Sequence, residues 1–163
     1  MGGVVYMDKR TQKLKVMMEC IKEPMLAILA ALLISSFVIS HTQVPTESML
    51  PTISPGNHLI VNRLPYYYRN PVCGEIVVFE YNGKNLIKRV IGTAGDIVDL
   101  KDGKVYVNGK ALEESSYLKE NDQTFTFTQS PIRFPYTVPE GFCFVLGDNR
   151  TNSSDSRVIG AIP

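Results

Sequence analysis

Ser48 is the first residue of this 163-residue chain whose setting could support chemistry. It lies in PTESMLPT (45–52), between two prolines, and follows directly on an apolar segment. A serine hydroxyl is a weak nucleophile unless a base lies within hydrogen-bond reach. Ser48 is therefore either a turn residue or a nucleophile whose base comes from elsewhere in the chain.

Lys88 is the candidate base, in the stretch NLIKRVIGTAGD (85–96). Alternate side chains of a strand share a face, so Lys88 should point the same way as the apolar Leu86 and Val90. Such a lysine is either an edge-strand residue that prevents aggregation, which is the commoner case, or a buried amine. Burial disfavours the ammonium form and lowers the lysine pKa, so a buried Lys88 could act as a neutral general base.

His58 is the alternative base for Ser48, but no obvious acidic residue is placed to orient its ring. Serine–lysine pairs are a known variant of the nucleophile-and-base arrangement. Sequence spacing alone leaves open whether Ser48 and Lys88 meet.

Composition and cysteine usage exclude several classes of function. A formal net charge of +1 gives no sign of nucleic-acid binding. The three cysteines and two histidines show no metal-ligand spacing, and nothing indicates a metal or a cofactor. A disulfide between Cys73 and Cys143 and a pair of buried free thiols are both open interpretations. The sequence gives no oligomeric state.

An apolar segment precedes Ser48 and could place it beside a membrane. Residues 25–40, MLAILAALLISSFVIS, carry no charge and, extended to Val44, approach the about 20 residues that a spanning helix needs. Basic residues outnumber acidic ones before this segment: Lys9, Arg10, Lys13, Lys15 and Lys22 stand against Asp8, Glu19 and Glu23. The excess of positive charge predicts that the N-terminal side is cytoplasmic.

We therefore expect a cytoplasmic segment over 1–24, a single-pass anchor in the cell membrane over 25–44 and an extracytoplasmic domain over 45–163. A cleaved signal peptide is one alternative, and the long N-terminal start argues against it. A core helix of a soluble protein is another, and the absence of a polar stripe from 25 to 34 argues against that.

The rest of the chain has a β pattern, with short runs of Val, Ile, Tyr and Phe between Gly, Asn, Asp and Pro. Asn-Gly and Asp-Gly pairs at 82–83, 102–103 and 108–109 predict hairpin turns. A hairpin-rich excursion is expected at about 101–140, with a possible turn over Ala111–Tyr117. The predicted strands are His58–Arg63, Glu75–Tyr81, Leu86–Ile91, Ile97–Leu100, Lys104–Val107, Thr124–Thr128 and Phe142–Leu146.

Two tyrosine-containing segments either touch a membrane surface or are ordinary loops: 64–69 and 134–136. Tyrosine favours the boundary between water and lipid, and the first of these segments also carries Arg69.

Four segments, in order behind an anchor, resemble the boxes of the bacterial type I signal peptidases. They are SMLPT (48–52), GEIVVF (74–79), KRVIGTAGD (88–96) and GDNRTNSSDSR (147–157). The resemblance implies a mainly β, signal-peptidase-like catalytic domain behind one N-terminal transmembrane helix. It also implies a membrane-bound serine endopeptidase that removes signal peptides from exported preproteins, after small residues at −3 and −1.

The resemblance assigns roles to individual residues. Ser48 would be the nucleophile and Lys88 the general base, while Thr46 and the Ser48 backbone N–H would hold the oxyanion. Ser153 would orient the lysine amine, with Asp155 and Arg157 as a supporting ion pair. Candidate walls of the substrate pocket are Met49, Leu50, Ile53, Ile60, Val61 and Leu86.

Two departures from the family pattern leave these assignments in place. Thr93-Ala94 stands where the family often has Leu-Pro, which loosens a turn. Many members continue past the position of Pro163, so this chain is either a minimal or a truncated version.

Three other classes of protein fit less well. A self-cleaving repressor-type protease should carry a DNA-binding domain and no membrane span. A sortase needs a reactive cysteine beside a histidine. A non-enzymatic anchored β domain would tolerate loss of Ser48.

Overall fold

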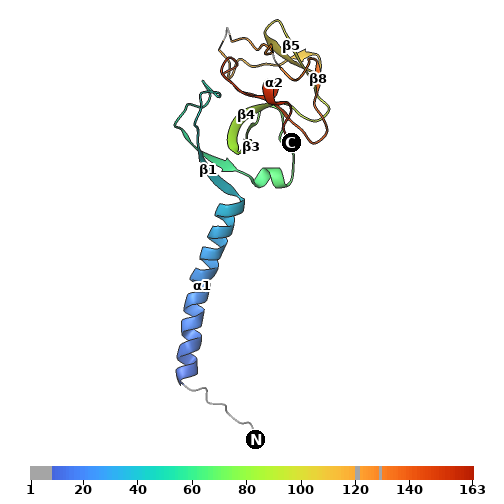
Figure 1. Ribbon diagram of the computed structural model, residues 1–163. Coiled ribbons are helices and arrows are strands. Elements are labelled where there is room, and N and C mark those ends of the chain that lie inside the picture. Colours follow the sequence, from blue (N-terminus) through green and yellow to red (C-terminus); the bar gives the residue numbers. More distant parts are fainter. Residues whose placement is uncertain (1–8, 120–121, 129) are drawn as a thin grey trace. The chain divides into compact units, whose positions relative to one another are not determined.

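The computed structural model describes residues 9–119, 122–128 and 130–163 and separates into two compact units (Figure 1). The helical unit comprises Met1–Ser40 and Asn62–Leu64, and the β unit comprises His41–Val61 and Pro65–Pro163. The part of the expected cytoplasmic segment that precedes residue 9, including Asp8, lies outside the described residues.

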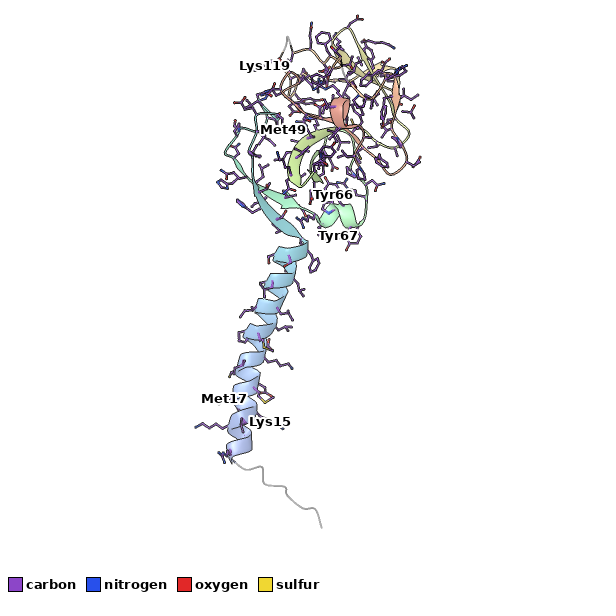
Figure 2. All side chains as sticks on the ribbon, viewed as in Figure 1. Lys15, Met17, Met49, Tyr66, Tyr67 and Lys119 are labelled. Carbon is purple, nitrogen blue, oxygen red and sulfur yellow. The ribbon has the colours of Figure 1, made fainter. Side chains whose placement is uncertain are left out.

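Helix α1 (Lys9–Phe37) dominates the helical unit. Its 26-residue stretch Gln12–Phe37 is long and apolar enough to cross a membrane, and none of it is buried. Side chains such as Lys15 and Met17 stand out from it (Figure 2). At 1.5 Å per residue this stretch is roughly 39 Å long, more than the about 30 Å of a hydrocarbon core.

The bounds of this helix differ from those expected for the anchor. The helix begins well before residue 25 because Lys, Arg, Glu, Gln and Met are good helix formers. It ends at Phe37, and strand β1 (Ile39–Gln43) follows, where the sequence predicts continued anchor. In β1 the backbone pairs with strand β2 (His58–Asn62) instead of continuing the helix.

The remaining elements are mostly strands, so the fold is mainly β, as predicted. Three sheets have the strand orders β1-β2, β3-β4-β9 and β7-β6-β5-β8. Beyond β1 and β2 the elements are η1 (Leu64–Tyr67), β3 (Ile76–Tyr81), β4 (Lys84–Gly92), β5 (Ile97–Lys101), β6 (Lys104–Val107), β7 (Lys110–Ala111), β8 (Tyr136–Thr137), β9 (Phe144–Leu146) and α2 (Ser156–Ile159).

Most predicted strands lie within two residues of these bounds, and the expected hairpin turns are present. Asn82, Asp102 and Asn108 have positive φ, each followed by a glycine that also has positive φ. In the interval Ala111–Tyr117, Ala111 belongs to β7 and a turn follows at 115–117.

The predicted strand Thr124–Thr128 is wrong, because this segment forms no regular structure. Its polar backbone groups find partners outside a strand ladder. The Thr124 N–H donates to the Gly103 carbonyl over 2.8 Å, and the Phe125 carbonyl accepts from Arg157 Nη1 over 3.1 Å. The segment Thr124–Thr128 therefore has the composition of a strand but packs as a loop.

Strand β4 connects the whole core of the β unit. It pairs antiparallel with β3 from Lys84 to Arg89, and with β9 only from Arg89 onward. Its residues Ile91, Val90 and Ile87 belong to three different buried clusters. Lys88 is thus fixed in the most constrained strand of the fold.

Candidate active site

Ser48 and Lys88 meet, although 40 residues separate them in the sequence. Lys88 Nζ lies 2.6 Å from Ser48 Oγ, and it also donates to the Ile87 carbonyl over 2.9 Å. Lys88 is 2% exposed and Ser48 7% exposed. A nucleophile-type hydroxyl and an amine therefore share one buried position.

Burial is the main influence on the Lys88 amine and lowers its pKa. The negative charges of Asp155 and Asp148 act in the opposite direction and raise that pKa. Since the net shift is downward, the buried position favours the neutral amine that a base requires.

The loop that carries Ser48 is held by short-range backbone bonds. The Leu50 N–H donates to the Glu47 carbonyl over 3.1 Å, and the Ile53 N–H donates to the Met49 carbonyl over 2.9 Å. Thr46 Oγ1 lies 3.2 Å from Ser48 Oγ, so these two hydroxyls share one side of the loop.

His58 is not close to Ser48 in a way that could make it the base. Its Nδ1 lies 2.9 Å from Nε2 of His41, and the two rings stack with centroids 5.0 Å apart. The partner of Ser48 Oγ among basic side chains is Lys88.

Ser153 lies at the site without the hydrogen bond to Lys88 that the resemblance predicts. Its Oγ is buried and has no hydrogen-bond partner within the described part of the chain. Gly147 explains how closely Ser153 approaches the Ser48 backbone. A Cβ on Gly147 would lie 2.2 Å from Ser153 Oγ and 2.5 Å from the Ser48 carbonyl oxygen, so only glycine fits between these two loops.

Asp155 and Arg157 form the expected ion pair, with 2.8 Å between Arg157 Nη2 and Asp155 Oδ2. Asp155 is also the N-cap of α2 and accepts from the Gly147 N–H over 3.0 Å. Arg157 Nη2 donates to the Arg150 carbonyl over 2.8 Å. The pair is buried, and it stabilises the curvature of the loop from Gly147 to α2.

Asp148 connects three segments of the β unit. Its carboxylate accepts two bonds of 2.8 Å from Arg89 and one of 2.5 Å from Thr52 Oγ1. The next N–H, of Asn149, donates to the Ser48 carbonyl over 3.0 Å. No role at the site was assigned to Arg89 or Thr52 from the sequence. The available signals were that Arg89 follows Lys88 directly and that Thr52 belongs to the motif SMLPT.

The candidate pocket residues fall into three groups. Met49 and Ile53 are buried in one cluster with Ile87, and Met49 is 1% exposed, so they support the loop from inside. Ile60 is 77% exposed. The half-buried candidates that a bound peptide could contact are Leu50, Val61 and Leu86.

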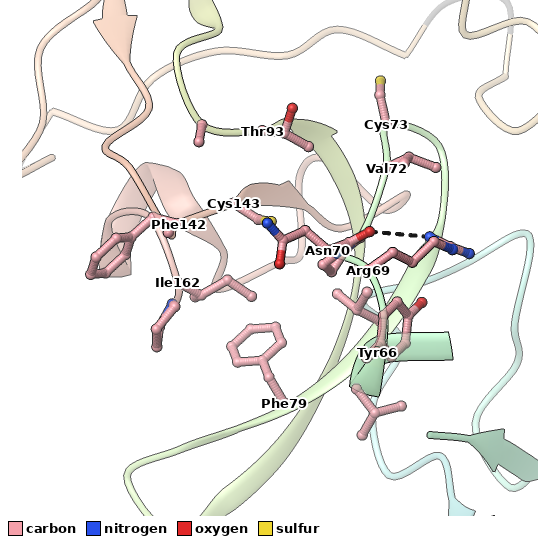
Figure 3. A pocket seen from close by; sticks show the side chains of 16 residues that line it. Tyr66, Arg69, Asn70, Val72, Cys73, Phe79, Thr93, Phe142, Cys143 and Ile162 are labelled. Carbon is pink, nitrogen blue, oxygen red and sulfur yellow. Dashed lines mark hydrogen bonds between the residues drawn. The ribbon is translucent and has the colours of Figure 1, made fainter. Parts of the chain in front are cut away.

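A cavity of about 610 Å³ lies against β3, and none of the residues predicted for the catalytic site lines it (Figure 3). Cys73 and Cys143 both contribute to its wall, and both are free thiols, so the disulfide interpretation is wrong. Cys143 is buried and Cys73 is exposed. Among the described residues, no three His, Cys, Asp or Glu side chains gather as a metal ion would require.

Known proteins are similar to this chain over nearly its whole length. A profile of the family described as signal peptidase, peptidase S26, matches residues 17–163. Signal peptidase I of Leptolyngbya laminosa is 37% identical over 160 residues, covering 90% of this chain and 73% of the relative. Signal peptidase I of Bacillus licheniformis is 37% identical over 155 residues, covering 92% and 83%. A crystal structure of a signal peptidase I from Enterococcus faecalis is 35% identical, with a TM-score of 0.49 over 58% of this chain and 90% of that one.

Replacing Gly147 by alanine should destabilise the β unit, because the new methyl group would overlap Ser153 and the Ser48 backbone. We expect Gly147→Ala to lower the free energy of unfolding by about 1–3 kcal/mol, measured by denaturant titration. Ser154→Ala, at an exposed position of the same loop, should stay within about 0.5 kcal/mol of the parent. Equal stability of the two variants would contradict the close approach at Gly147.

Proposed function

The chain belongs to the signal peptidases of peptidase family S26, and we propose that it cleaves signal peptides from exported preproteins with Ser48 as nucleophile and Lys88 as general base. The family supports signal-peptide cleavage by a serine peptidase. The observation that carries the mechanism is the 2.6 Å contact between Lys88 Nζ and Ser48 Oγ at a buried position.

The chemistry follows from a neutral Lys88. The amine accepts the Ser48 hydroxyl proton while Oγ bonds to the carbonyl carbon of the scissile peptide. The ammonium then gives that proton to the departing nitrogen, and the C–N bond breaks to leave an ester on Ser48. Water activated by the same amine hydrolyses the ester, releases the signal peptide and regenerates the serine.

The charge that develops on the carbonyl oxygen needs fixed donors. We assign this role to the Ser48 backbone N–H and the Thr46 hydroxyl. The 3.2 Å between Thr46 Oγ1 and Ser48 Oγ supports the assignment, because it keeps the Thr46 hydroxyl beside the attacking atom.

The substrate segment binds as an added strand along the N-terminal half of β4. Within the described residues, β4 has β3 on one side from Lys84 to Arg89, whereas β9 covers the opposite side only from Arg89 onward. The open side ends beside Lys88. In an extended peptide the side chains at −1 and −3 share a face, so both would point toward the same wall, where Leu50 and Leu86 are half-buried candidates.

The membrane topology follows from α1. The stretch Gln12–Phe37 is long and apolar enough to support a single span. Basic residues outnumber acidic ones ahead of its charge-free part, which begins at residue 25, and this excess supports a cytoplasmic N-terminus. The β unit would then work outside, and Ser48 would lie close to the bilayer. The 11 residues from Phe37 to Ser48 reach at most about 40 Å even when fully extended.

Loss of either member of the pair should abolish cleavage. Ser48→Ala removes the nucleophile, and Lys88→Ala removes the base and should lower the rate at least ~10²–10⁴-fold. The assay is cleavage of a preprotein with an Ala-X-Ala site by the full chain in detergent. Ser54→Ala and Lys110→Ala, at exposed positions, should cleave like the parent. Parent-like cleavage by Ser48→Ala or Lys88→Ala would overturn the mechanism.

Thr46→Val should keep the fold and lower kcat by ~10²–10³, because an oxyanion donor acts mainly in the transition state. KM should change little, as measured in steady-state cleavage of the same preprotein. Thr126→Val, an exposed threonine with only a long bond to the Phe127 carbonyl, serves as the control. An unchanged kcat for Thr46→Val would reject Thr46 as a donor.

Cleavage should accelerate as pH rises through the lowered pKa of Lys88 and then level off. The reason is the sign of the shift: burial lowers this pKa, and only the neutral amine present above it can take the serine proton. The profile of kcat/KM against pH measures this directly. A rate that peaks in acid and falls through neutral pH would indicate a carboxylate base instead.

A further inference from the structure

We propose that Glu114, in the segment between β7 and β8, is a positioning residue for the Ser48–Lys88 pair, an inference that rests on the function proposed above. Glu114 lies 36 residues from Arg150 in the sequence, yet their side chains form an ion pair with 2.5 Å between Oε1 and Nη2. Arg150 and Glu114 are only 1% and 10% exposed, so this ion pair is shielded from water.

The first arm of contacts runs from Glu114 through Arg150 to the nucleophile. Arg150 Nε donates to the Gly147 carbonyl over 3.0 Å, so the guanidinium joins Glu114 to the backbone of Gly147. Gly147 is the residue without room for a Cβ between Ser153 and the Ser48 carbonyl. A shift of Arg150 would therefore move the backbone against which the Ser48 loop is packed.

The second arm runs from Glu114 to the strand of the base. The Tyr117 hydroxyl donates to Glu114 Oε1 over 2.9 Å, and the Tyr117 ring lies under the Arg89 guanidinium, 4.0 Å from ring centroid to Cζ. Arg89 follows Lys88 in β4 and forms the 2.8 Å ion pair with Asp148. The two sets of contacts thus end on adjacent residues. The set through Arg150 reaches Gly147, next to the Ser48 loop, and the set through Tyr117 and Arg89 reaches Asp148, next to the strand of Lys88.

Glu114 is the acidic member on which both arms depend. Removing one partner of a buried ion pair leaves the other charge uncompensated, and the structure relaxes to solvate it. For Arg150 that relaxation means leaving the Gly147 carbonyl. By contrast, the pair Asp155–Arg157 joins two residues at the start of α2 and has no contact with Glu114 among those described.

Misplacement by a fraction of an ångström affects chemistry more than binding. The peptide edge of β4 would remain, while the approach of Ser48 to Lys88 would loosen and admit water to the amine. Water around Lys88 would reduce the desolvation that lowers its pKa. Two separate signatures follow: a lower kcat at unchanged KM, and an acid limb of the pH profile displaced to higher pH.

The test compares Glu114→Gln with Tyr117→Phe in cleavage of an Ala-X-Ala preprotein by the full chain across a range of pH. We expect Glu114→Gln to lose ~10–100-fold in kcat with KM little changed, and to shift the acid limb to higher pH. Tyr117→Phe removes only the hydroxyl and keeps the ring under Arg89, so it should shift both quantities in the same direction by less. Glu113→Gln, at the exposed neighbouring position, should match the parent.

The pH profile separates positioning from simple loss of stability. A variant that only unfolds more easily loses rate in proportion to its folded fraction at each pH. Its rate per folded enzyme, with the folded fraction measured at each pH, therefore keeps the acid limb of the parent. Two results would overturn the role of Glu114. One is an acid limb that matches the parent in both Tyr117→Phe and the folded fraction of Glu114→Gln. The other is parent-like kinetics of these variants. An inactive parent chain would instead overturn the proposed function.

Discussion

The exclusion of water from one lysine amine is the constraint on which the rest of this structure depends. A buried ammonium is costly, so the fold must supply enough surrounding order to keep Lys88 in place regardless of its charge. Strand β4 supplies it, because three buried clusters converge on that strand. The same rigidity brings a serine from a distant loop within 2.6 Å of the amine. The catalysis proposed for this pair would therefore depend on the same placement of Lys88 as the packing of the core.

Buried charges around this position are paired, and the pairs Arg89–Asp148 and Glu114–Arg150 join segments that are far apart in the sequence. Asp148 connects β4 to the loop of Ser48 and to the loop that follows β9. Charged pairs of this kind contribute little net stability, but they fix which loops meet, since an unpaired partner would be strongly unfavourable. The site is held by these directional bonds together with the buried clusters that meet at β4.

Strand periodicity and the order of four motifs were enough to predict a mainly β domain and to single out Ser48 and Lys88. Other features depend on contacts that no local pattern encodes. Thr124–Thr128 has strand composition, but the Arg157 side chain and the Gly103 carbonyl bond to backbone groups of this segment. Met49 resembles a pocket residue beside the nucleophile and instead fills the core. The partnership of Glu114 with Arg150 spans 36 residues, and single-sequence reasoning has no access to such pairs.

If precursors bind along the half-covered strand β4, as proposed, there is a consequence for the range of precursors that one such enzyme can serve. A strand edge recognises peptide groups, which every polypeptide carries in the same spacing, whatever its side chains. Only the residues that face the wall beside the site would be selected for size. Precursors with unrelated sequences would then bind the same strand edge through the same backbone hydrogen bonds and compete for it. Evolutionary drift in most of their residues would leave their processing unaffected.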